Sequence, residues 1–309
     1  MKKITALVLL SGGLDSILAV KLLQKQGIKV TGLCLVSYFF NAQLAKKAAK
    51  NLGIKLKIVD FSDQHLAMVK KPKHGYGKIM NPCLDCHILM LEKAKKIMAK
   101  EKFNLVATGE VLGERPFSQN KQALKIVERE SGLEGYLLRP LSARLLEPTI
   151  PEKRGWVNRR KLLAIKGRCR RPQITLAKKW GLPEYPQPAG GCLLTDPQFG
   201  QRLKELLEKW PDCHGNDIQL LKIGRHFWAG PASFGKRPGA NEDKLVVGRN
   251  EQENKDLEKL KRPGDIVIKP RHFPGPTILI RGRPKIRAES LVKAKELMIK
   301  YSPKLRSMV

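Results

Sequence analysis

The amino-acid sequence predicts an α/β protein whose first domain has a doubly wound parallel sheet, followed by a small basic linker domain and a C-terminal α+β domain. Strand and helix patterns alternate along the first part. The apolar run Ile4 to Leu10 ends at a glycine turn, and apolar residues at helical spacing follow from Leu14 to Lys25. This alternation indicates right-handed βαβ units. Near Ser142 prolines interrupt the pattern, and from about Asn216 short apolar stretches indicate a separate fold.

The remaining elements follow from the same patterns in chain order. Further parallel strands are expected at residues 29–36, 55–60 and 104–108, with helices at 42–51 and 84–100. Short helices are expected in the proline-interrupted part at 159–164, 172–179 and 199–209. In the last part of the chain, from about Asn216, the same patterns predict strands at 219–223, 244–247, 265–268 and 277–280, with helices at 252–261 and 288–300. The predicted domains are 1–141, 142–212 and 213–309.

Positive charge dominates the composition. The 309 residues include 60 Lys and Arg against 28 Asp and Glu, which gives a formal net charge of +32. The excess is concentrated between Arg139 and Gly181, where only Glu147 and Glu152 are acidic. A local excess of this kind is typical of a surface that binds a phosphate backbone, and a solvated lysine-rich surface is the alternative. No stretch approaches the roughly 20 apolar residues of a membrane span, so we expect a cytoplasmic protein without membrane contact.

A glycine-containing loop follows the first expected strand and leads directly into a helix. It reads Ser11-Gly12-Gly13-Leu14-Asp15-Ser16. Glycines let phosphate approach the backbone, and a helix N-terminus directs N–H groups at an anion. The serine hydroxyls add donors, whereas the carboxylate of Asp15 indicates a bridging Mg²⁺ or a role in shaping the backbone. We therefore expect this loop to bind ATP.

The loop resembles the PP-loop of the ATP pyrophosphatase superfamily, whose members split ATP between the α and β phosphates and adenylate a substrate. By that resemblance Asp15 organises Mg²⁺ for catalysis, Leu33 flanks the adenine, and the segment after a later strand closes the nucleotide site. These segments follow expected strands at their carboxyl ends, where ligands of open α/β sheets bind. The residues that the resemblance implies for ATP binding are Ser11, Gly12, Gly13, Asp15, Ser16, Leu33, Thr108 and Gly109.

Two cysteines stand at the start of a predicted helix, in the sequence Cys83-Leu84-Asp85-Cys86. This spacing suits a redox pair, half of a zinc site or part of an iron–sulfur site. Cys192 follows two glycines in a turn suited to presenting a thiol. Cys213 and His214 could complete a zinc site with the first pair.

The cysteine sequence is similar to a motif of the tRNA 2-thiouridylases. The resemblance rests on Asn81-Pro82-x-x-x-Cys86 and on Gly191-Cys192, which match the two catalytic cysteines of that family. Cys83 departs from the pattern, because aspartate usually follows Asn-Pro. The resulting set of three looks like the pattern of iron–sulfur-dependent tRNA thiolases, which implies a [4Fe-4S] cluster on Cys83, Cys86 and Cys192. A persulfide on Cys86 that Cys192 resolves is the alternative, and a zinc or structural role is a third.

The C-terminal part resembles an NFACT-R type RNA-binding domain. The resemblance rests on residues 244–250 and 265–276, which combine strand patterns with basic residues able to contact phosphates and 2′-hydroxyls. A helper domain without RNA contact is the alternative. We expect Arg139 either at the leaving pyrophosphate or tRNA, or in an ion pair. The predicted RNA-binding residues are Arg168, Arg170, Arg171, Arg249, Asn250 and Arg271.

Together these resemblances imply an ATP-dependent tRNA thiouridine synthase that adenylates a uridine carbonyl oxygen and inserts sulfur. The implied cofactors are ATP, Mg²⁺ and the [4Fe-4S] cluster. The implied partners are tRNA and a sulfur donor, either sulfide or a sulfur-carrier protein, and the sequence is compatible with a homodimer. A PP-loop ligase or amidotransferase acting on a small molecule is one rival, and a non-catalytic RNA-binding factor is another.

Overall fold

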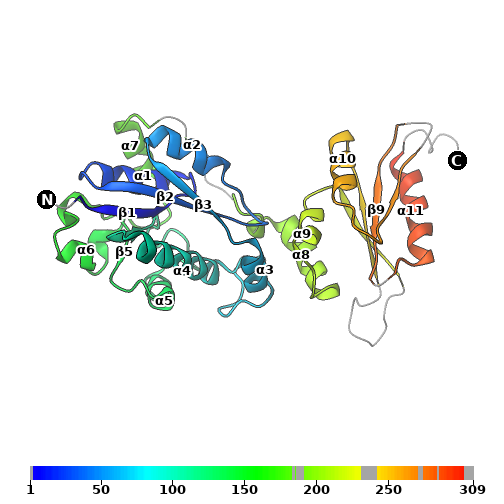
Figure 1. The fold of residues 1–309 in the computed structure, drawn as a ribbon, viewed down its shortest axis with the longest axis horizontal. Helices are drawn as coiled ribbons and strands as arrows, with labels where there is room; N and C mark the ends of the chain where they lie inside the picture. The colour runs from blue at the N-terminus through cyan, green and yellow to red at the C-terminus, as the bar shows by residue number, and fades with distance from the viewer. Residues whose placement is uncertain are drawn as a thin grey trace. The chain divides into compact units, whose positions relative to one another are not determined.

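The computed structural model describes residues 3–182, 185, 191–230, 242–270, 274–283 and 285–302. The chain divides into two compact units between Leu193 and Leu194 (Figure 1). The first contains a parallel sheet and the second an antiparallel sheet, so the predicted α/β and α+β folds are confirmed. The division falls inside the basic region predicted at 142–212, and the boundaries of three separate domains stay a prediction.

The first unit is built on a five-stranded parallel sheet with the order β3-β2-β1-β4-β5. Its strands are β1 (Thr5–Leu9), β2 (Lys29–Val36), β3 (Lys55–Asp60), β4 (Leu105–Ala107) and β5 (Leu137–Leu138). The central strand β1 pairs with β2 on one side and with β4 on the other, where Ala6 lies opposite Val30 and Leu105. The strand order reverses between β1 and β4. In open α/β sheets, ligands bind beyond the carboxyl ends of the strands at such a point.

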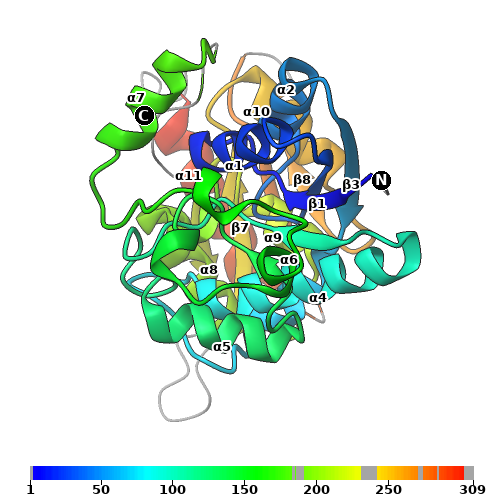
Figure 2. The ribbon, with the colours of Figure 1, turned by 90° about the vertical axis from the view of Figure 1, so that its left-hand side faces the viewer.

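Helices cover both faces of this sheet (Figure 2). One face packs against α1 and α2 through Ile17, Val20 and Ala45, and the other packs against α4 and α5 through Leu91 and Val127. Both faces are buried, which explains the continuous apolar runs of the strands. The helices of this unit are α1 (Leu14–Gln24), α2 (Gln43–Leu52), α3 (Ser62–Lys70), α4 (Cys83–Glu101), α5 (Lys121–Ser131), α6 (Ile150–Lys153) and α7 (Arg171–Lys179). Short 3₁₀ helices are η1 (Ala143–Leu145), η2 (Arg159–Lys161) and η3 (Leu193–Thr195), so the helix predicted at 159–164 is only one 3₁₀ turn.

The second unit has a four-stranded antiparallel sheet with the order β6-β7-β9-β8. The strands are β6 (Arg225–Ala229), β7 (Asp243–Val247), β8 (Ile266–Ile268) and β9 (Ile278–Arg281). The helices are α8 (Pro197–Lys209), α9 (Gly215–Leu220), α10 (Glu251–Lys259) and α11 (Ala288–Tyr301). One face of the sheet packs on α11, and the other packs on α9 and α10. No helix within the described parts of the chain is long and apolar enough to cross a membrane.

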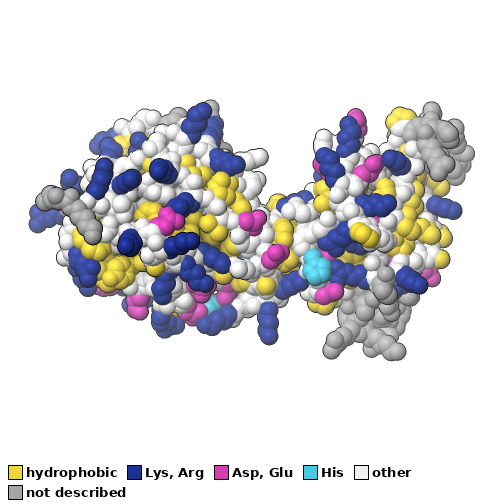
Figure 3. Space-filling view, in the orientation of Figure 1, with side chains coloured by type: hydrophobic (Ala, Val, Ile, Leu, Met, Phe, Trp, Pro, Cys, Tyr) yellow, Lys and Arg dark blue, Asp and Glu magenta, His cyan; other side chains and the backbone are white. Residues whose placement is uncertain are grey.

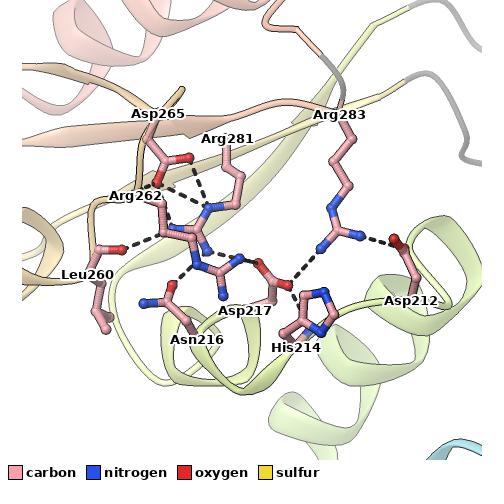
Figure 4. Close-up of polar contacts among 9 residues, drawn as sticks. All are labelled: Asp212, His214, Asn216, Asp217, Leu260, Arg262, Asp265, Arg281 and Arg283. Carbon is pink, nitrogen blue, oxygen red and sulfur yellow. Dashed lines mark hydrogen bonds and ion pairs between the residues drawn. The ribbon is translucent and has the colours of Figure 1, made fainter.

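The strand predicted at 219–223 is wrong, because this segment contains the end of α9 and a turn. Asp217 caps α9 by accepting the backbone N–H of His214 at 2.8 Å. The same carboxylate accepts from Arg281 on β9 at 2.8 Å and from Arg283 at 2.8 Å (Figure 4). Arg281 also makes an ion pair with Asp265, at 2.7 Å. These buried ion pairs anchor a helix to the sheet, an arrangement that the apolar pattern of the segment alone does not reveal.

A lysine of the second unit is buried and makes no ion pair within the described residues. Lys244 on β7 is 1% exposed, and its Nζ has no hydrogen-bond partner within the part of the chain that the structure describes. The ammonium lies over the Trp228 ring, 4.2 Å from its centroid. Burial lowers the pKa of Lys244 to about 7, an effect that Glu205 on α8 opposes and that Arg202 and Lys209 reinforce. The fold therefore disfavours the charged form, and Lys244 loses its proton as the pH rises through about 7.

We predict that the second unit becomes more stable as the pH rises from about 7 towards 10. The unfolded lysine, with its pKa near 10.5, binds a proton throughout this window, whereas the folded one has lost it, so raising the pH removes a cost of folding. The gain should be roughly 3–5 kcal/mol in the free energy of unfolding, because each unit of pKa difference is worth about 1.4 kcal/mol. Chemical unfolding followed by tryptophan fluorescence at pH 6.5 and 9.5 measures it. Lys244→Met should remove this part of the pH dependence, and an unchanged dependence in that variant contradicts the account.

Candidate functional site

The loop between β1 and α1 is fixed by its own hydroxyls and by α2. The Gly13 N–H donates to Ser11 Oγ at 3.2 Å, and Ser16 Oγ donates to Gly13 O at 2.8 Å. Gly12 has a φ of 83°, and a Cβ there would lie 2.5 Å from Leu44 O. The dihedral angle and the close approach both require glycine. The loop is thus preformed at the positive N-terminus of α1, which is a favourable place for phosphate.

The loop after β4 packs directly on the loop before α1. A Cβ on Gly109 would lie 2.5 Å from Ser16 N and 2.6 Å from the carbonyl carbon of Asp15. Since β1 and β4 are the neighbours at which the strand order reverses, these two loops meet where a ligand is expected. The sequence placed Gly109 at the nucleotide site by resemblance, and the structure gives it a physical reason to be glycine.

The side chains of Leu33 and Thr108 lie inside the fold. Leu33 is 1% exposed in the core, and its carbonyl accepts from Leu10 N at 2.8 Å. Thr108 is 4% exposed, and its hydroxyl donates to Glu110 at 2.9 Å. Both side chains therefore serve packing or hydrogen bonding inside the fold. These two residues would contact ATP through their backbone atoms. Their role at the nucleotide stays a prediction.

Asp15 carries a carboxylate oxygen that lacks a partner. Its Oδ1 is buried and accepts no hydrogen bond from any described residue, while its Oδ2 lies 3.9 Å from Arg170 Nη2. Burial raises the pKa of Asp15, and the Arg170 guanidinium partly opposes this. Gln173 on α7 is also fully buried, and its amide lies close enough to the Asp15 carboxylate to lower its pKa. Oxygen atoms of carboxylate and amide groups are ligands that Mg²⁺ accepts, so the donor set at this loop fits the ion.

The cysteines predicted to work together lie close enough to influence one another. Cys83 and Cys86 are in the first turn of α4, and Leu193, next to Cys192, donates its N–H to Phe39 O at 3.1 Å. Burial, followed by the neighbouring thiols of Cys192 and Cys83, raises the pKa of Cys86 well above its usual range. That the three thiols act together in one functional site stays a prediction.

The donor chemistry of this site fits an iron–sulfur cluster, since cysteine thiolates are the usual ligands of such clusters. Across the described residues, however, no set of three or more His, Cys, Asp or Glu side chains is arranged as a metal site. Of the zinc set considered from the sequence, Cys83 and Cys86 belong to the first unit, and Cys213 and His214 to the second. Cys213 is buried in the second unit, and the backbone of His214 belongs to the cap of α9.

No motif in the sequence singles out His65, although the residue contacts Cys86. His65 lies on α3 and is fully buried, and its Nε2 is 3.3 Å from Cys86 Sγ. Burial lowers the pKa of His65 to about 4, so the ring is neutral at physiological pH. No motif spacing relates the two residues in the sequence, because only the packing of α3 against α4 joins them.

A buried ion-pair network connects the cysteine helix to the nucleotide loops. The Glu110 carboxylate lies 2.9 Å from His87 Nδ1 on α4 and accepts from Arg139 Nε at 2.9 Å. Burial opposes ionisation of Glu110, but the Arg139 guanidinium and the His87 ring hold its pKa below the usual range. Arg139 also pairs with Glu128 on α5. Arg139 is 2% exposed, so of the roles that the sequence left open the structure supports the ion pair, in the interior rather than at the surface.

The predicted RNA-binding residues have varied surroundings. Arg168 and Arg171 are exposed, whereas Arg170 faces Asp15. Arg249 Nε donates to Glu253 at 2.9 Å, and Asn250 caps α10 by accepting from the Glu253 N–H at 2.9 Å. Arg271 lies outside the described residues. Figure 3 shows Lys and Arg side chains spread over the visible face of the first unit, with few acidic ones between them.

Two protein families match this chain. The tRNA methyl transferase HUP domain family matches residues 4–151, which include the nucleotide loops and the first two cysteines of the site. The NFACT protein RNA binding domain family matches residues 237–307. The two matches do not overlap, and each covers less than half of the chain. The boundary between the two structural units lies between these matches.

Curated proteins that are similar to part of this chain are named as tRNA sulfurtransferases or tRNA thiouridylases. A probable tRNA sulfurtransferase of Finegoldia magna is 30% identical over 141 residues, which cover 44% of this chain and 35% of that protein. A tRNA-specific 2-thiouridylase of Treponema denticola is 35% identical over 121 residues, covering 33% and 32%. The chain therefore spans about a third of the length of these relatives. A solved 4-thiouridine synthetase–RNA complex with bound ATP is 20% identical, with a TM-score of 0.43 over 71% of this chain and 52% of that one.

We predict that Gly109→Ala abolishes measurable ATP binding. The added methyl group would lie 2.5 Å from Ser16 N, so the two loops must separate where phosphate is expected. Isothermal titration calorimetry measures the affinity. Gly191→Ala is the matched control, because among the described residues beyond its chain neighbours no atom lies within 4 Å of a Cβ at that position. Equal affinities for the two variants contradict the geometry.

We predict that Glu110→Gln lowers the free energy of unfolding of the first unit by roughly 3–5 kcal/mol, because it leaves the buried Arg139 charge only partly compensated. Urea unfolding measures the change. Glu147→Gln, a substitution of an exposed glutamate in the same unit, should change the stability by less than about 0.5 kcal/mol. Similar values for the two variants would show that the network contributes little.

Proposed function

We propose that this protein is an ATP-dependent tRNA thiouridine synthase. One observation carries the proposal: the nucleotide loops and the first turn of α4, which holds Cys83 and Cys86, are joined by a continuous set of contacts in one unit. Gly109 packs on Asp15, the next residue Glu110 contacts His87, and His87 follows Cys86. A site that places ATP beside thiols is suited to activating a substrate oxygen and replacing it with sulfur. The names of the curated relatives support the same chemistry.

In the first step a uridine carbonyl oxygen attacks the α phosphate of ATP. The new O–P bond adenylates the base, and pyrophosphate leaves. Ser11, Gly13 and the N-terminus of α1 would hold the phosphates, and Asp15 would hold Mg²⁺ through its unpaired Oδ1. Arg170 lies beside this carboxylate and would offset the charge of the leaving pyrophosphate.

In the second step hydrosulfide attacks the adenylated carbon. A C–S bond forms, the C–O bond breaks, and AMP leaves with the former carbonyl oxygen while the sulfur loses its proton. No change of oxidation state is required if the donor is sulfide. The partners of the reaction are therefore tRNA and a source of sulfide, either free or delivered by a carrier protein.

Cys83, Cys86 and Cys192 would hold the sulfur for this step. When bound by these three residues, a [4Fe-4S] cluster would supply an iron position without a protein ligand that accepts sulfide. A persulfide on Cys86 is the alternative, with Cys192 attacking it so that an S–S bond forms as sulfur leaves. The electrostatic interaction of Cys86 with Cys192 is consistent with either route.

The second unit and the basic surface of the first would bind the tRNA. Arg168 and Arg171 are exposed on the segment that leads into α7, and Arg249 lies at the start of α10 in the NFACT domain. With a net charge of +32, binding should weaken steeply with added salt, since phosphate contacts release counterions. A PP-loop ligase for a small molecule would show no such binding. A non-catalytic RNA-binding factor would bind tRNA without consuming ATP.

We predict that Asp15→Ala and Cys192→Ala each reduce tRNA thiolation by at least about a hundredfold, because each removes a group that acts on the reacting atoms. Mass spectrometry of nucleosides from tRNA treated with protein, ATP and sulfide measures the product. Cys169→Ala is the matched control, because Cys169 is exposed and outside the site. Full activity of Asp15→Ala would contradict the proposed role of Asp15, and a wild type that binds tRNA but forms no thiouridine would leave only the role of an RNA-binding factor.

Iron and sulfide analysis after anaerobic purification separates the two sulfur routes. The cluster route predicts bound iron and sulfide in the wild type and their loss in Cys83→Ala. Full thiolation by an iron-free wild type, with activity retained in Cys83→Ala, would favour the persulfide route.

A further inference from the structure

Each of the first two cysteine sulfurs has a nitrogen within hydrogen-bond reach. Asn81 Nδ2 donates to Cys83 Sγ at 3.2 Å, and His65 Nε2 lies 3.3 Å from Cys86 Sγ. Asn81 is held by its own loop, where its Oδ1 accepts from Ile79 N at 3.0 Å. His65 comes from a different helix, α3, and its position depends on the tertiary fold.

Aromatic rings enclose His65 and determine its orientation. The Phe61 ring stacks on the imidazole at 4.8 Å between centroids, and the Phe39 ring meets it edge-on at 5.3 Å. The Phe39 carbonyl also accepts from Leu193 N, the residue after Cys192. One aromatic cluster therefore fixes both the histidine beside Cys86 and the chain beside Cys192.

The surroundings of the ring determine which nitrogen carries its proton. His65 Nδ1 is buried and makes no hydrogen bond to any residue that the structure describes. A buried N–H without an acceptor is rarer in proteins than an acceptor without a donor, because the unpaired donor costs more. The proton is therefore on Nε2, and the ring donates to the sulfur of Cys86.

We propose that His65 is a positioning residue that donates its Nε2–H to Cys86 Sγ and thereby fixes this sulfur for the transfer of sulfur to the substrate. The role of His65 in sulfur transfer rests on the proposed function, whereas its contact with Cys86 does not. Hydrogen bonds to cysteine sulfur orient the thiol and tune its chemistry in persulfide and iron-bound forms alike. The histidine thus suits either sulfur route.

Three substitutions separate the hydrogen bond from the shape of the ring. His65→Phe keeps an aromatic ring among the phenylalanines and removes the donor. His65→Gln places an amide nitrogen near the position of Nε2, whereas His65→Asn places one near Nδ1, away from the sulfur. Thermal unfolding checks the fold of each variant, and the comparison of Gln with Asn remains informative if the Phe variant does not fold.

The first measurement is the rate at which iodoacetamide modifies Cys86 in the reduced, metal-free protein, with Cys83 in the same molecule as the reference. We expect the ratio of the Cys86 rate to the Cys83 rate to fall about tenfold in His65→Phe and His65→Asn, and to recover to within about threefold in His65→Gln. Asn81→Ala should raise the ratio, because it removes the hydrogen bond donated to Cys83. An unchanged ratio in all the His65 variants, or equal effects of Gln and Asn, overturns the proposal.

The second measurement is thiolation at saturating ATP. His65→Phe should lower kcat about tenfold and leave the KM for ATP unchanged, with rescue by His65→Gln. If the wild type forms no thiouridine, the proposed function fails, while the ratio of modification rates still decides whether His65 acts on Cys86. If the ratio is unchanged while the wild type is active, only the role of His65 is refuted.

Discussion

The close contact between two loops at the carboxyl edge of the parallel sheet determines the rest of the site. Gly109 has room for no side chain because Asp15 and Ser16 lie against it. The next residue, Glu110, is a buried carboxylate that is stable only because Arg139 and His87 surround it. Through these neighbours the nucleotide loop is joined to the first turn of α4, where Cys83 and Cys86 lie. A change in any of the three segments is therefore expected to reach the other two, because direct contacts join them.

Much of this arrangement could be predicted from the sequence, because its determinants are local. The loop of residues 11–16 and the pair Cys83 and Cys86 appear as short motifs, and the alternation of strands and helices gave the parallel sheet. The contacts that join distant segments left no such pattern. His65 has no spacing relation to Cys86, and Arg139 had three plausible surroundings until the fold placed it beside Glu110.

The second unit shows how ion pairs can override an apolar pattern. Residues 219–223 read as a strand, but Asp217 caps a helix there and is held by Arg281 and Arg283 (Figure 4). The same unit buries Lys244 against the Trp228 ring. Basic side chains such as Lys244 and Arg281 are therefore buried in the interior of this unit. Arg249 and Asn250, chosen from the sequence as RNA contacts, also stabilise the start of α10, so their substitution would affect folding as well as binding.

The central claim is that one site both consumes ATP and delivers sulfur, so the number of AMP molecules released should match the number of thiouridines formed. The direct test is a single reaction of the purified protein with tRNA, sulfide and labelled ATP, in which AMP and thiouridine are both quantified. We expect ATP to be converted to AMP and pyrophosphate, with about one AMP released for each thiouridine formed. Release of ADP, or AMP formation with no sulfur in the tRNA, would contradict it.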